Sequence, residues 1–465
     1  MSEGSQVPEK RTSGRSLGWA VFFAEFFLCC GMATYFYANY IMTDIIHLPV
    51  DQVSGIMAVG SIVAVVLIFI EGFLVTNTRT KFGQYRPWIV GSYFVLVAAI
   101  FILMFLDGDS MLVVALCFVL YSLAAFAAVA PASPKYTLFA NISGSDNDLR
   151  NLLNARMWGG NSVSNFIVSA ILFPMIALLS ISGSEIWGWR ITQIIMIVAT
   201  TIGVIIICKI SAPYDQCSAA NGAPEVEEEH VSAGEMIKAV VTNRPALAIT
   251  LADFFRYAGV NVFSLLTIYQ CAYVIGDMVL TSTVMAAYSL ATIIGSFAST
   301  GITKLFGGRK RMSIIVSLIA GVAFVLVGFF GQSSVWLIAL IAIAGFFNSP
   351  IDSVGVVMYM DAGEYWIAKT GKDTRPFIMN MQPLVIQAAT AVASVIMGVA
   401  LTTSGFIAGE ALTAAGAQTL TMWLGMATGA GFILFALCLI LIHNISDKKM
   451  EEYMRLNAEN GLTLE

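Results

Sequence analysis

The chain has 465 residues, of which 58% are hydrophobic and only 11% charged, and its formal net charge is -5. Soluble domains average about 25% charged residues, so this chain cannot cover a globular surface with polar side chains. The composition excludes a soluble enzyme, a secreted disulfide scaffold and a nucleic-acid-binding protein, and it predicts an integral membrane protein. The net charge says nothing about partners, because in a membrane protein the placement of charge matters more than its sum.

Twelve apolar segments follow one another along the chain, and a spanning helix needs about 20 apolar residues. The polar stretch 211–244, which contains a run of glutamates, divides them into six and six. The segments are expected near residues 17–44, 53–75, 88–106, 111–140, 157–182, 187–210, 245–275, 280–304, 312–331, 334–361, 380–404 and 417–443. The sequence therefore predicts an all-α membrane protein with two six-helix bundles at 17–210 and 245–443, a linker at 211–244, and tails at 1–16 and 444–465.

The basic residues are unevenly divided between the two sides of such a bundle. If the N-terminus lies in the cytoplasm and the segments alternate, 21 of the 24 lysines and arginines fall on the cytoplasmic side. Lys135 then lies at the cytoplasmic end of the fourth segment, Arg256 lies inside the seventh, and only Arg190 falls outside. By the positive-inside rule, this bias predicts a multi-pass protein of the plasma (inner) membrane with both termini in the cytoplasm.

No metal site, cofactor or catalytic residue is expected. The chain has 7 cysteines and 3 histidines, which lack metal-ligand spacing, and the cysteines are typical of buried thiols. A membrane enzyme needs clustered acid–base side chains, and the sequence has no such cluster. Twelve helices in two halves are instead the layout of a carrier that binds a small solute near the midplane.

Few ionisable side chains lie inside the apolar segments, and each is a functional candidate because an unpaired charge in a bilayer costs several kcal/mol. Asp253 and Arg256 are three residues apart on the seventh segment, so they share a face and either neutralise each other or contact substrate. Asp352, in the tenth segment, is expected either to hydrogen-bond between helices or to take part in binding. Glu71 lies within two turns of Arg79, and here a salt bridge and proton coupling are alternatives.

Two further charges stand out in the first and fourth segments. Glu25 has no basic residue within a helical turn, so it must pair with another helix, face water or be protonated. The fourth segment ends at residues 131–136 (PASPKY), where two prolines free backbone carbonyls, and irregular backbone at membrane depth is tolerated where it lines a cavity. Lys135 beside Tyr136 would suit an anionic or sugar-like ligand, and the alternative is a lysine that extends to the cytoplasmic interface.

Three stretches together resemble the glycoside–pentoside–hexuronide:cation symporter family, the melibiose-permease-like carriers. Residues 77–89 (NTRTKFGQYRPWI) are similar to the family's loop after the second helix, and residues 273–277 (YVIGD) to the end of its seventh. Residues 361–365 (DAGEY), followed by 369–372 (KTGK), resemble its signature after the tenth helix, with about three extra residues before the lysine. The resemblance implies the fold of the major facilitator superfamily.

The resemblance also implies a partial sugar site. Arg156 and Gln382 fall where the family places side chains that hydrogen-bond sugar hydroxyls, and Tyr136 falls at the position of a stacking tryptophan. The two aspartates that anchor the sugar in the family fall at Ala132 and near Leu28. Glu25, about one turn from the latter position, is a candidate to replace one of them.

The family's cation site is not preserved. The two aspartates of the second helix that bind sodium fall at Ala64 and Ile68, and the lysine that accompanies them falls at Gln387. Sodium needs oxygen ligands, which alanine and isoleucine side chains lack, so we expect no sodium coupling by the family mechanism. Proton coupling and uncoupled transport are the alternatives. The candidates for coupling or protonation are Glu25, Glu71, Asp253, Arg256 and Gln387.

The expected function is secondary transport of a small polar organic solute, a glycoside or a related compound, by a monomer that has no nucleic-acid partner. Loss of the acidic anchors together with gain of Lys135 and Arg256 favours an acidic glycoside or another organic anion. The alternatives are an uncoupled facilitator or exchanger of an organic anion and a transporter-like solute receptor. The expected substrate contacts are Arg156, Gln382, Tyr136, Lys135, Asp253 and Asp352. The residues expected to latch the cytoplasmic ends through ion pairs are Arg79, Arg86, Asp361 and Glu364.

Overall fold

The computed structural model describes residues 14–143, 147–181, 184–215, 242–370, 375–443 and the single positions 449, 452, 453 and 457. Within these residues, twelve helical segments are long and apolar enough to cross a membrane, which confirms the predicted number of spans. The predicted tails at 1–16 and 444–465 and the predicted linker at 211–244 lie largely outside the described residues.

The first, fourth and seventh spans are each built from more than one helix. The first consists of α1 (Gly14–Cys30), η1 (Tyr35–Tyr37), α2 (Ala38–Tyr40) and the π-helix η2 (Ile41–Ile45), and the fourth of α5 (Met111–Val129) and α6 (Ala132–Ser143). The seventh consists of α10 (Arg244–Tyr269) and the π-helix η4 (Gln270–Ile275). The remaining spans are α3 (Val50–Asn77), α4 (Arg86–Leu103), α7 (Asn147–Leu179), α8 (Glu185–Ser211), α11 (Leu280–Leu305), α12 (Arg309–Phe330), α13 (Ser334–Thr370), α14 (Arg375–Thr403) and α15 (Ala414–Leu441).

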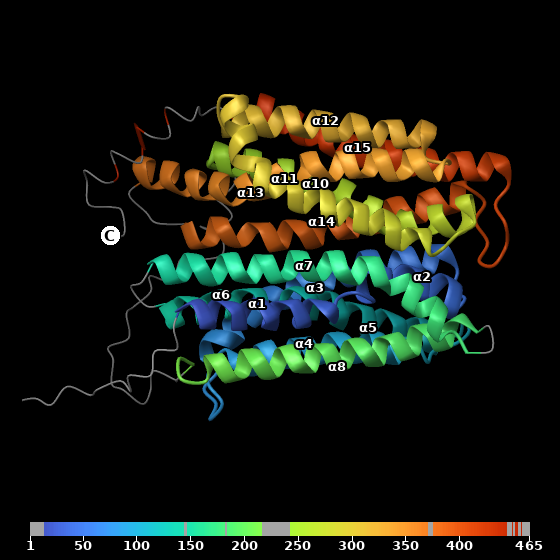
Figure 1. The fold of residues 1–465 in the computed structure, drawn as a ribbon, viewed down its shortest axis with the longest axis horizontal. Helices are drawn as coiled ribbons and strands as arrows, with labels where there is room; N and C mark the ends of the chain where they lie inside the picture. Colours follow the sequence, from blue (N-terminus) through green and yellow to red (C-terminus); the bar gives the residue numbers. More distant parts are fainter. Residues whose placement is uncertain are drawn as a thin grey trace, which may run out of the picture.

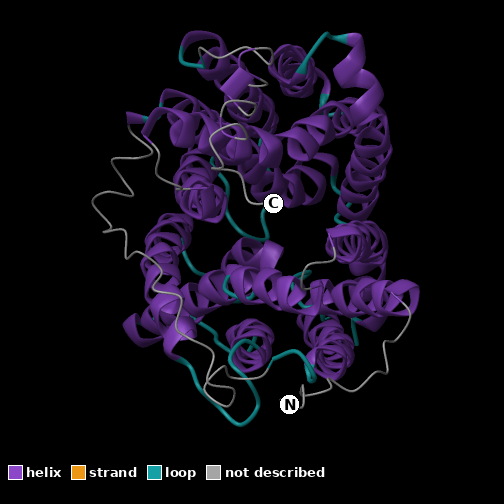
Figure 2. Ribbon diagram, turned by 90° about the vertical axis from the view of Figure 1, so that its left-hand side faces the viewer, coloured by secondary structure: helices purple, strands orange, loops and turns teal. Residues whose placement is uncertain are grey.

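The helices form two layers, with α1–α8 in one and α10–α15 in the other (Figure 1). The layers meet where α3 packs on α14 and α7 packs on α11. We call the end of the bundle at which α1 begins and α15 ends the terminal end, and the opposite end the far end. Figure 2 looks along the bundle from the terminal end. Six spans therefore precede the stretch 211–244 and six follow it, and the bounds expected for the two halves stay predictions.

The buried apolar side chains form three clusters, which differ at the two ends. One large cluster includes residues of both halves, among them Tyr40 of the first span and Tyr269 of the seventh. Two smaller clusters each belong to a single half: one surrounds Leu28 of α1, and the other surrounds Ile249 of α10. The halves thus share one core toward the far end and have separate cores toward the terminal end, which is the arrangement of a bundle closed at the far end.

Glycines allow close helix contacts at two places that matter for the site. A Cβ atom at Gly160 of α7 would lie 2.3 Å from the carbonyl oxygen of Phe22 in α1, and one at Gly295 of α11 would lie 2.2 Å from the carbonyl oxygen of Phe346 in α13. Only glycine permits such approach of two backbones, as in other membrane bundles. These contacts hold α1 against α7 and α11 against α13.

Candidate functional site

The first half contains a buried ion pair between α1 and α6. The Lys135 ammonium lies 2.8 Å and 3.0 Å from the two carboxylate oxygens of Glu25, and it donates a third hydrogen bond of 3.0 Å to the hydroxyl of Tyr93. Glu25 is 5% exposed and Lys135 is 7% exposed. Of the alternatives for Glu25, the structure thus selects a partner on another helix.

Lys135 does not extend to the interface, and that alternative is wrong. The fourth span breaks after Val129 and resumes as α6 at Ala132, so that Lys135 lies in the first turn of a helix that continues to Ser143. Proline is tolerated in a first helical turn because no intrahelical hydrogen bond is lost there, which explains why Pro134 does not end the span. The break directs Lys135 toward α1 rather than toward the membrane surface.

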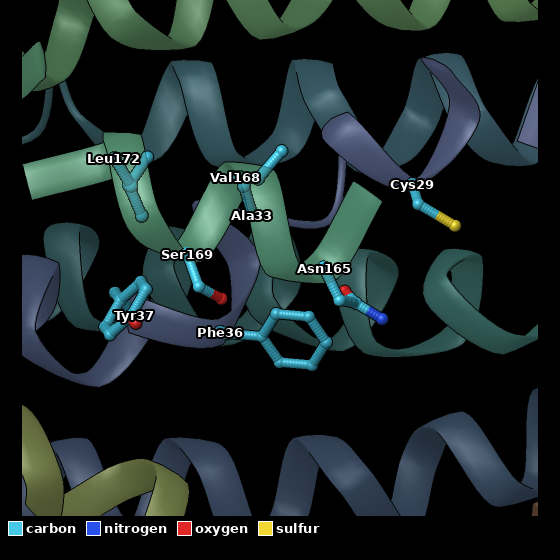
Figure 3. A pocket seen from close by; sticks show the side chains of 8 residues that line it. All are labelled: Cys29, Ala33, Phe36, Tyr37, Asn165, Val168, Ser169 and Leu172. Atoms are coloured by element: carbon cyan, nitrogen blue, oxygen red, sulfur yellow. The ribbon is translucent and has the colours of Figure 1, made fainter. Parts of the chain in front are cut away.

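A chain of polar side chains leads from this ion pair to a pocket. The Cys29 thiol donates to Glu25 Oε1 at 3.6 Å, Asn161 Nδ2 lies 3.0 Å from the Cys29 sulfur, and Asn165 Nδ2 lies 2.8 Å from Asn161 Oδ1. Figure 3 shows the pocket, which is lined by Cys29, Ala33, Phe36, Tyr37, Asn165, Val168, Ser169 and Leu172. The sequence interpretation missed these asparagines, although amides at positions 161 and 165 share one face of a membrane-spanning helix.

The second half contains a cluster of three charges around Arg256 of α10. The guanidinium donates to Asp352 Oδ1 of α13 at 2.7 Å and to Asp253 Oδ1, one turn back on its own helix, at 3.2 Å. Arg256 and Asp253 are buried, whereas the side chain of Asp352 is 47% exposed. The internal pair of Asp253 and Arg256 is present, and Asp352 makes the interhelical hydrogen bond that is one of its two alternatives. Roles of these residues in binding stay predictions.

Amide and phenol groups surround this cluster. Asn348 accepts a hydrogen bond of 3.0 Å from Arg256 and donates one of 3.3 Å to Asp352 Oδ2. The Arg256 guanidinium also lies 4.3 Å from the ring centroid of Tyr257, a cation–π contact. Gln382 of α14 donates to the Tyr257 hydroxyl at 3.1 Å. Gln382, a predicted substrate contact, is thereby connected to the charged cluster through one side chain.

The two halves carry these groups at corresponding positions. Residues 24–27 (AEFF) of α1 correspond to residues 252–255 (ADFF) of α10, and a glycine follows six residues after each carboxylate. In the fourth span of each half, a Ser-Pro pair precedes the charged residue, in 133–135 (SPK) and in 349–352 (SPID). The halves differ in sign, because the fourth-span charge is basic in the first half and acidic in the second.

Two of the predicted substrate contacts, Arg156 and Tyr136, make no hydrogen bond or ion pair with either cluster among the described residues. The guanidinium of Arg156 lies 4.0 Å from the ring centroid of Trp19, and Arg156 is half-buried. Tyr136 follows Lys135 on α6 and is 44% exposed. Their roles in binding stay predictions.

The positions equivalent to the family's cation site are apolar or already engaged. Ala64 is buried. Gln387 is also buried, and it donates a hydrogen bond of 3.1 Å to the carbonyl oxygen of Ala125 in the other half. Gln387 therefore joins the halves.

Glu71 does not pair with Arg79. α3 ends at Asn77 and Thr78 is extended, so Arg79 does not lie on the helical face that carries Glu71. Arg79 is exposed. Glu71 itself is 5% exposed, and its Oε1 atom is buried without a hydrogen-bond partner. The salt bridge of Glu71 with Arg79 is thus absent, and the role of Glu71 in coupling stays a prediction.

Three of the four predicted gate residues have a recorded partner, and none of these partners belongs to the opposite half. Arg86 pairs with Asp215 at 3.2 Å, and Asp361 pairs with Arg309 at 3.1 Å. Glu364 accepts a hydrogen bond of 2.8 Å from Asn457. None of these pairs joins the two halves in this conformation, so a latch between the terminal ends stays a prediction for the opposite conformation.

At the far end, by contrast, hydrogen bonds join the two halves directly. Asn39 donates to the carbonyl oxygen of Leu265 at 2.9 Å, and the hydroxyls of Thr43 and Tyr269 share a hydrogen bond of 2.8 Å. Tyr273, at the end of the seventh span, donates to the carboxylate of Asp44 in η2. The sequence interpretation missed this network, whose one signal was the position of Tyr273 within the second of the three family-like stretches.

Twelve spans in two halves, with paired charges inside both halves and closure at one end, define a membrane carrier of the major facilitator type. Residues 26–446 match the family described as MFS/sugar transport protein, and the chain belongs to this family. The resemblance inferred from the three sequence stretches is therefore confirmed, as is the conclusion that the protein is a transporter rather than an enzyme.

Three further proteins illustrate what the chain is similar to. It is 23% identical over 391 residues to the raffinose carrier protein of Pediococcus pentosaceus, covering 78% of this chain but only 58% of that relative. It is 28% identical over 174 residues, 37% of each chain, to a putative 2,3-dihydroxypropane-1-sulfonate exporter of Salmonella typhimurium. The nucleoside transporter NupG superposes with a TM-score of 0.62 at 11% identity, over 94% of this chain and 100% of NupG, which is a likeness of fold alone.

Proposed function

We propose that the protein is a secondary active transporter that moves a small polar organic solute across the plasma membrane by alternating access. The observation that carries this proposal is the exposure of polar side chains inside apolar spans of both halves. Asn165 of α7 and Asp352 of α13 are both exposed, and polar or charged groups that face lipid are strongly disfavoured. These side chains therefore face a water-filled cavity, where a polar solute would bind.

The conformation supports alternating access. The halves share a core and hydrogen bonds at the far end, and they have separate cores at the terminal end. With both termini in the cytoplasm, as the distribution of basic residues indicates, this is the inward-facing state. Rocking of the halves would break the far-end contacts around Asp44 and Tyr273 and bring the terminal ends together. Arg79, Arg86, Asp361 and Glu364 are then the candidates for a latch at the terminal end.

The substrate class that the geometry supports best is a glycoside or a related polyhydroxylated solute. Lys135 pairs with Glu25, and Arg256 with two aspartates, so the gain of these two basic residues no longer favours an anionic substrate. Amide and phenol groups such as Gln382 and Tyr257 hydrogen-bond hydroxyls without requiring charge. We propose that Arg156 and Tyr136 complete the site from the first half.

An acidic solute is the second candidate, and a separate observation favours it. Part of the chain is 28% identical to a putative exporter of 2,3-dihydroxypropane-1-sulfonate, an organic anion with two hydroxyl groups. For this chain to bind such an anion, a carboxylate partner of Lys135 or Arg256 would have to be displaced or protonated. The exposed partner is Asp352.

For coupling, we propose a proton rather than sodium at the usual family position, because Ala64 and Ile68 supply no oxygen ligands there. The buried carboxylates of Glu25, Glu71 and Asp253 are the candidates from the sequence. An uncoupled facilitator or exchanger and a solute receptor without transport are the competing functions. Both are outcomes of the experiment that follows.

The test is uptake into proteoliposomes that contain the purified full-length protein. Solutes are first screened by thermal stabilisation, since a ligand that binds only the folded state raises the melting temperature. Raffinose and 2,3-dihydroxypropane-1-sulfonate serve as the neutral and anionic probes. Accumulation of a stabilising solute supports the proposal, equilibration without accumulation indicates a facilitator, and binding without uptake or exchange overturns the transport function.

Arg156→Ala tests the first-half part of the site. We expect loss of thermal stabilisation by the solute, because the variant lacks the guanidinium that would bind it. Lys304→Met, which removes an exposed charge at the end of α11, is the control and should retain stabilisation. Unchanged affinity in Arg156→Ala would remove this residue from the site.

A further inference from the structure

The charged clusters of the two halves differ in their net charge. In the first half, one carboxylate, Glu25, faces one ammonium, Lys135, and their charges cancel. In the second half, two carboxylates, Asp253 and Asp352, share the single guanidinium of Arg256. With all three groups ionised, one positive against two negative charges gives a formal net charge of -1 inside the span.

Asp352 is the member of this cluster that water can reach. Its side chain is 47% exposed, whereas the side chains of Arg256 and Asp253 are each 1% exposed. Asp352 lies in the interior of an apolar span, α13, so its exposed surface faces the cavity rather than lipid. A proton or ion that enters this cavity therefore meets the excess charge at Asp352.

The groups around Asp352 suit a proton better than a metal ion. Its Oδ1 accepts a hydrogen bond of 2.7 Å from Arg256, and its Oδ2 accepts one of 3.3 Å from the Asn348 amide. Both neighbours are N–H donors, and one is cationic, whereas a hard cation needs several oxygen ligands. A proton needs only one of the oxygens of Asp352.

Other titratable groups near Asp352 come from two neighbouring helices. In the described part of the chain they are Asp253, Arg256 and Tyr257 on α10 and Tyr288 on α11. Gln382 of α14 contacts Tyr257 and is uncharged. Among these residues Arg256 provides the positive charge close to Asp352. Part of the hydrogen-bonding capacity of the Arg256 guanidinium is already used by Asp253.

We propose that Asp352 is the proton-binding residue of this carrier and that its protonation neutralises the Arg256 cluster before the halves rock. A proton from cavity water binds a carboxylate oxygen of Asp352, which leaves one carboxylate opposite one guanidinium. The cluster then matches the neutral Glu25–Lys135 pair of the first half. The proton returns to water when the cavity opens on the other side.

Neutralisation matters because alternating access passes through an occluded state. While the cavity is open, water solvates the exposed carboxylate of Asp352. When the cavity closes and that water leaves, an unbalanced charge in a low-dielectric interior becomes costly. The protonated carrier is therefore the form that changes conformation readily. Transport of solute coupled to this step rests on the proposed function, whereas protonation of Asp352 itself does not.

Protonation is tested without any solute by infrared difference spectroscopy of the purified full-length protein as the pH is lowered. A protonated carboxyl group in a protein interior gives a separate carbonyl band. We expect this band in the wild type and a loss of its Asp352 contribution in Asp352→Asn, with partial recovery in Asp352→Glu. The comparison variant is Asp51→Asn, which replaces an exposed carboxylate in the first turn of α3 and should keep the Asp352 contribution. A band of unchanged amplitude in Asp352→Asn overturns the proposal.

Coupling is tested in proteoliposomes with whichever of raffinose and 2,3-dihydroxypropane-1-sulfonate stabilises the protein. We expect Asp352→Asn to retain exchange of labelled for unlabelled solute and to lose accumulation driven by an imposed pH gradient, at least 10-fold relative to the wild type. Accumulation equal to that of the wild type overturns the coupling role. If the wild type transports neither probe, the proposed function fails on these probes, and the infrared result still decides the protonation of Asp352.

Discussion

The ion pair between Glu25 and Lys135 allows a quantitative test of the first-half site. Lys135→Met removes the ammonium but keeps an unbranched apolar side chain in its place. The Glu25 carboxylate then remains in a site where the intact residue is 5% exposed, with the Cys29 thiol as its other recorded partner. Removing one member of a buried ion pair typically costs about 3–5 kcal/mol, because the remaining charge is uncompensated.

The second mutation separates this penalty from simple loss of contacts. Glu25→Gln on the Lys135→Met background removes the orphaned charge, and replacing both members of a buried pair is often close to neutral. We therefore expect the double variant to be more stable than Lys135→Met alone, by about 2 kcal/mol or more. The coupling energy between the two sites should then be at least about 2 kcal/mol, within the range known for residues in contact.

The measurement is the free energy of unfolding in lipid bicelles by steric trapping, for the wild type, both single variants and the double variant. Lys304→Met is the matched control, because Lys304 is an exposed lysine, and surface substitutions usually change stability by less than about 0.5 kcal/mol. A Lys135→Met variant as stable as this control would refute the reasoning. So would a double variant whose loss equals the sum of the two single losses.

Three further predictions concern the far end, helix packing and a terminal-end loop. Tyr273→Phe removes a hydrogen bond to the Asp44 carboxylate, worth about 1.5–3 kcal/mol. The ratio of far-end-open to far-end-closed molecules, measured from spin-label distance distributions, should therefore rise about 10- to 100-fold, and an unchanged distribution would contradict this. Gly295→Ala should lower stability by about 1–3 kcal/mol, because its Cβ would lie 2.2 Å from a backbone oxygen. Gly91→Ala, where no atom lies within 4 Å, should leave the melting temperature unchanged, and equal effects would refute the packing argument. Asp215→Asn should make residues 78–85 more sensitive to proteolysis, because Asp215 accepts hydrogen bonds from three consecutive backbone amides of residues 84–86; wild-type cleavage rates would contradict this.

The spans could be predicted because a membrane-crossing segment can be recognised from consecutive residues, without knowledge of how the helices pack. An apolar run of about 20 residues is visible in the sequence whatever its neighbours are. The pair of Asp253 and Arg256 could be predicted for a similar reason, since three residues on one helix fix a shared face. The buried linkage of Glu25 to Lys135 could not, because it joins residues 110 positions apart and depends on how two helices are rotated.

Two alternatives considered from the sequence, for Glu71 and for Lys135, are contradicted because they depend on where a helix ends. The expected salt bridge of Glu71 with Arg79 assumed that the helix continued, but α3 ends at Asn77. The alternative in which Lys135 extends to the membrane surface requires the span to end at the prolines beside it, whereas the chain starts a new helix there. Both alternatives concern where a helix stops, and helix boundaries are the least reliable part of a reading from sequence alone.

α13 is much longer than a membrane is thick. At 1.5 Å per residue, its 37 residues extend for about 55 Å, whereas a hydrocarbon core is about 30 Å thick. Its final turns, up to Thr370, therefore project from the terminal end as a stiff continuation of the helix that carries Asp352. A small tilt at the membrane centre is magnified at such a tip. A spectroscopic label near Lys369 would act as a pointer that reports the orientation of the second half from outside the membrane.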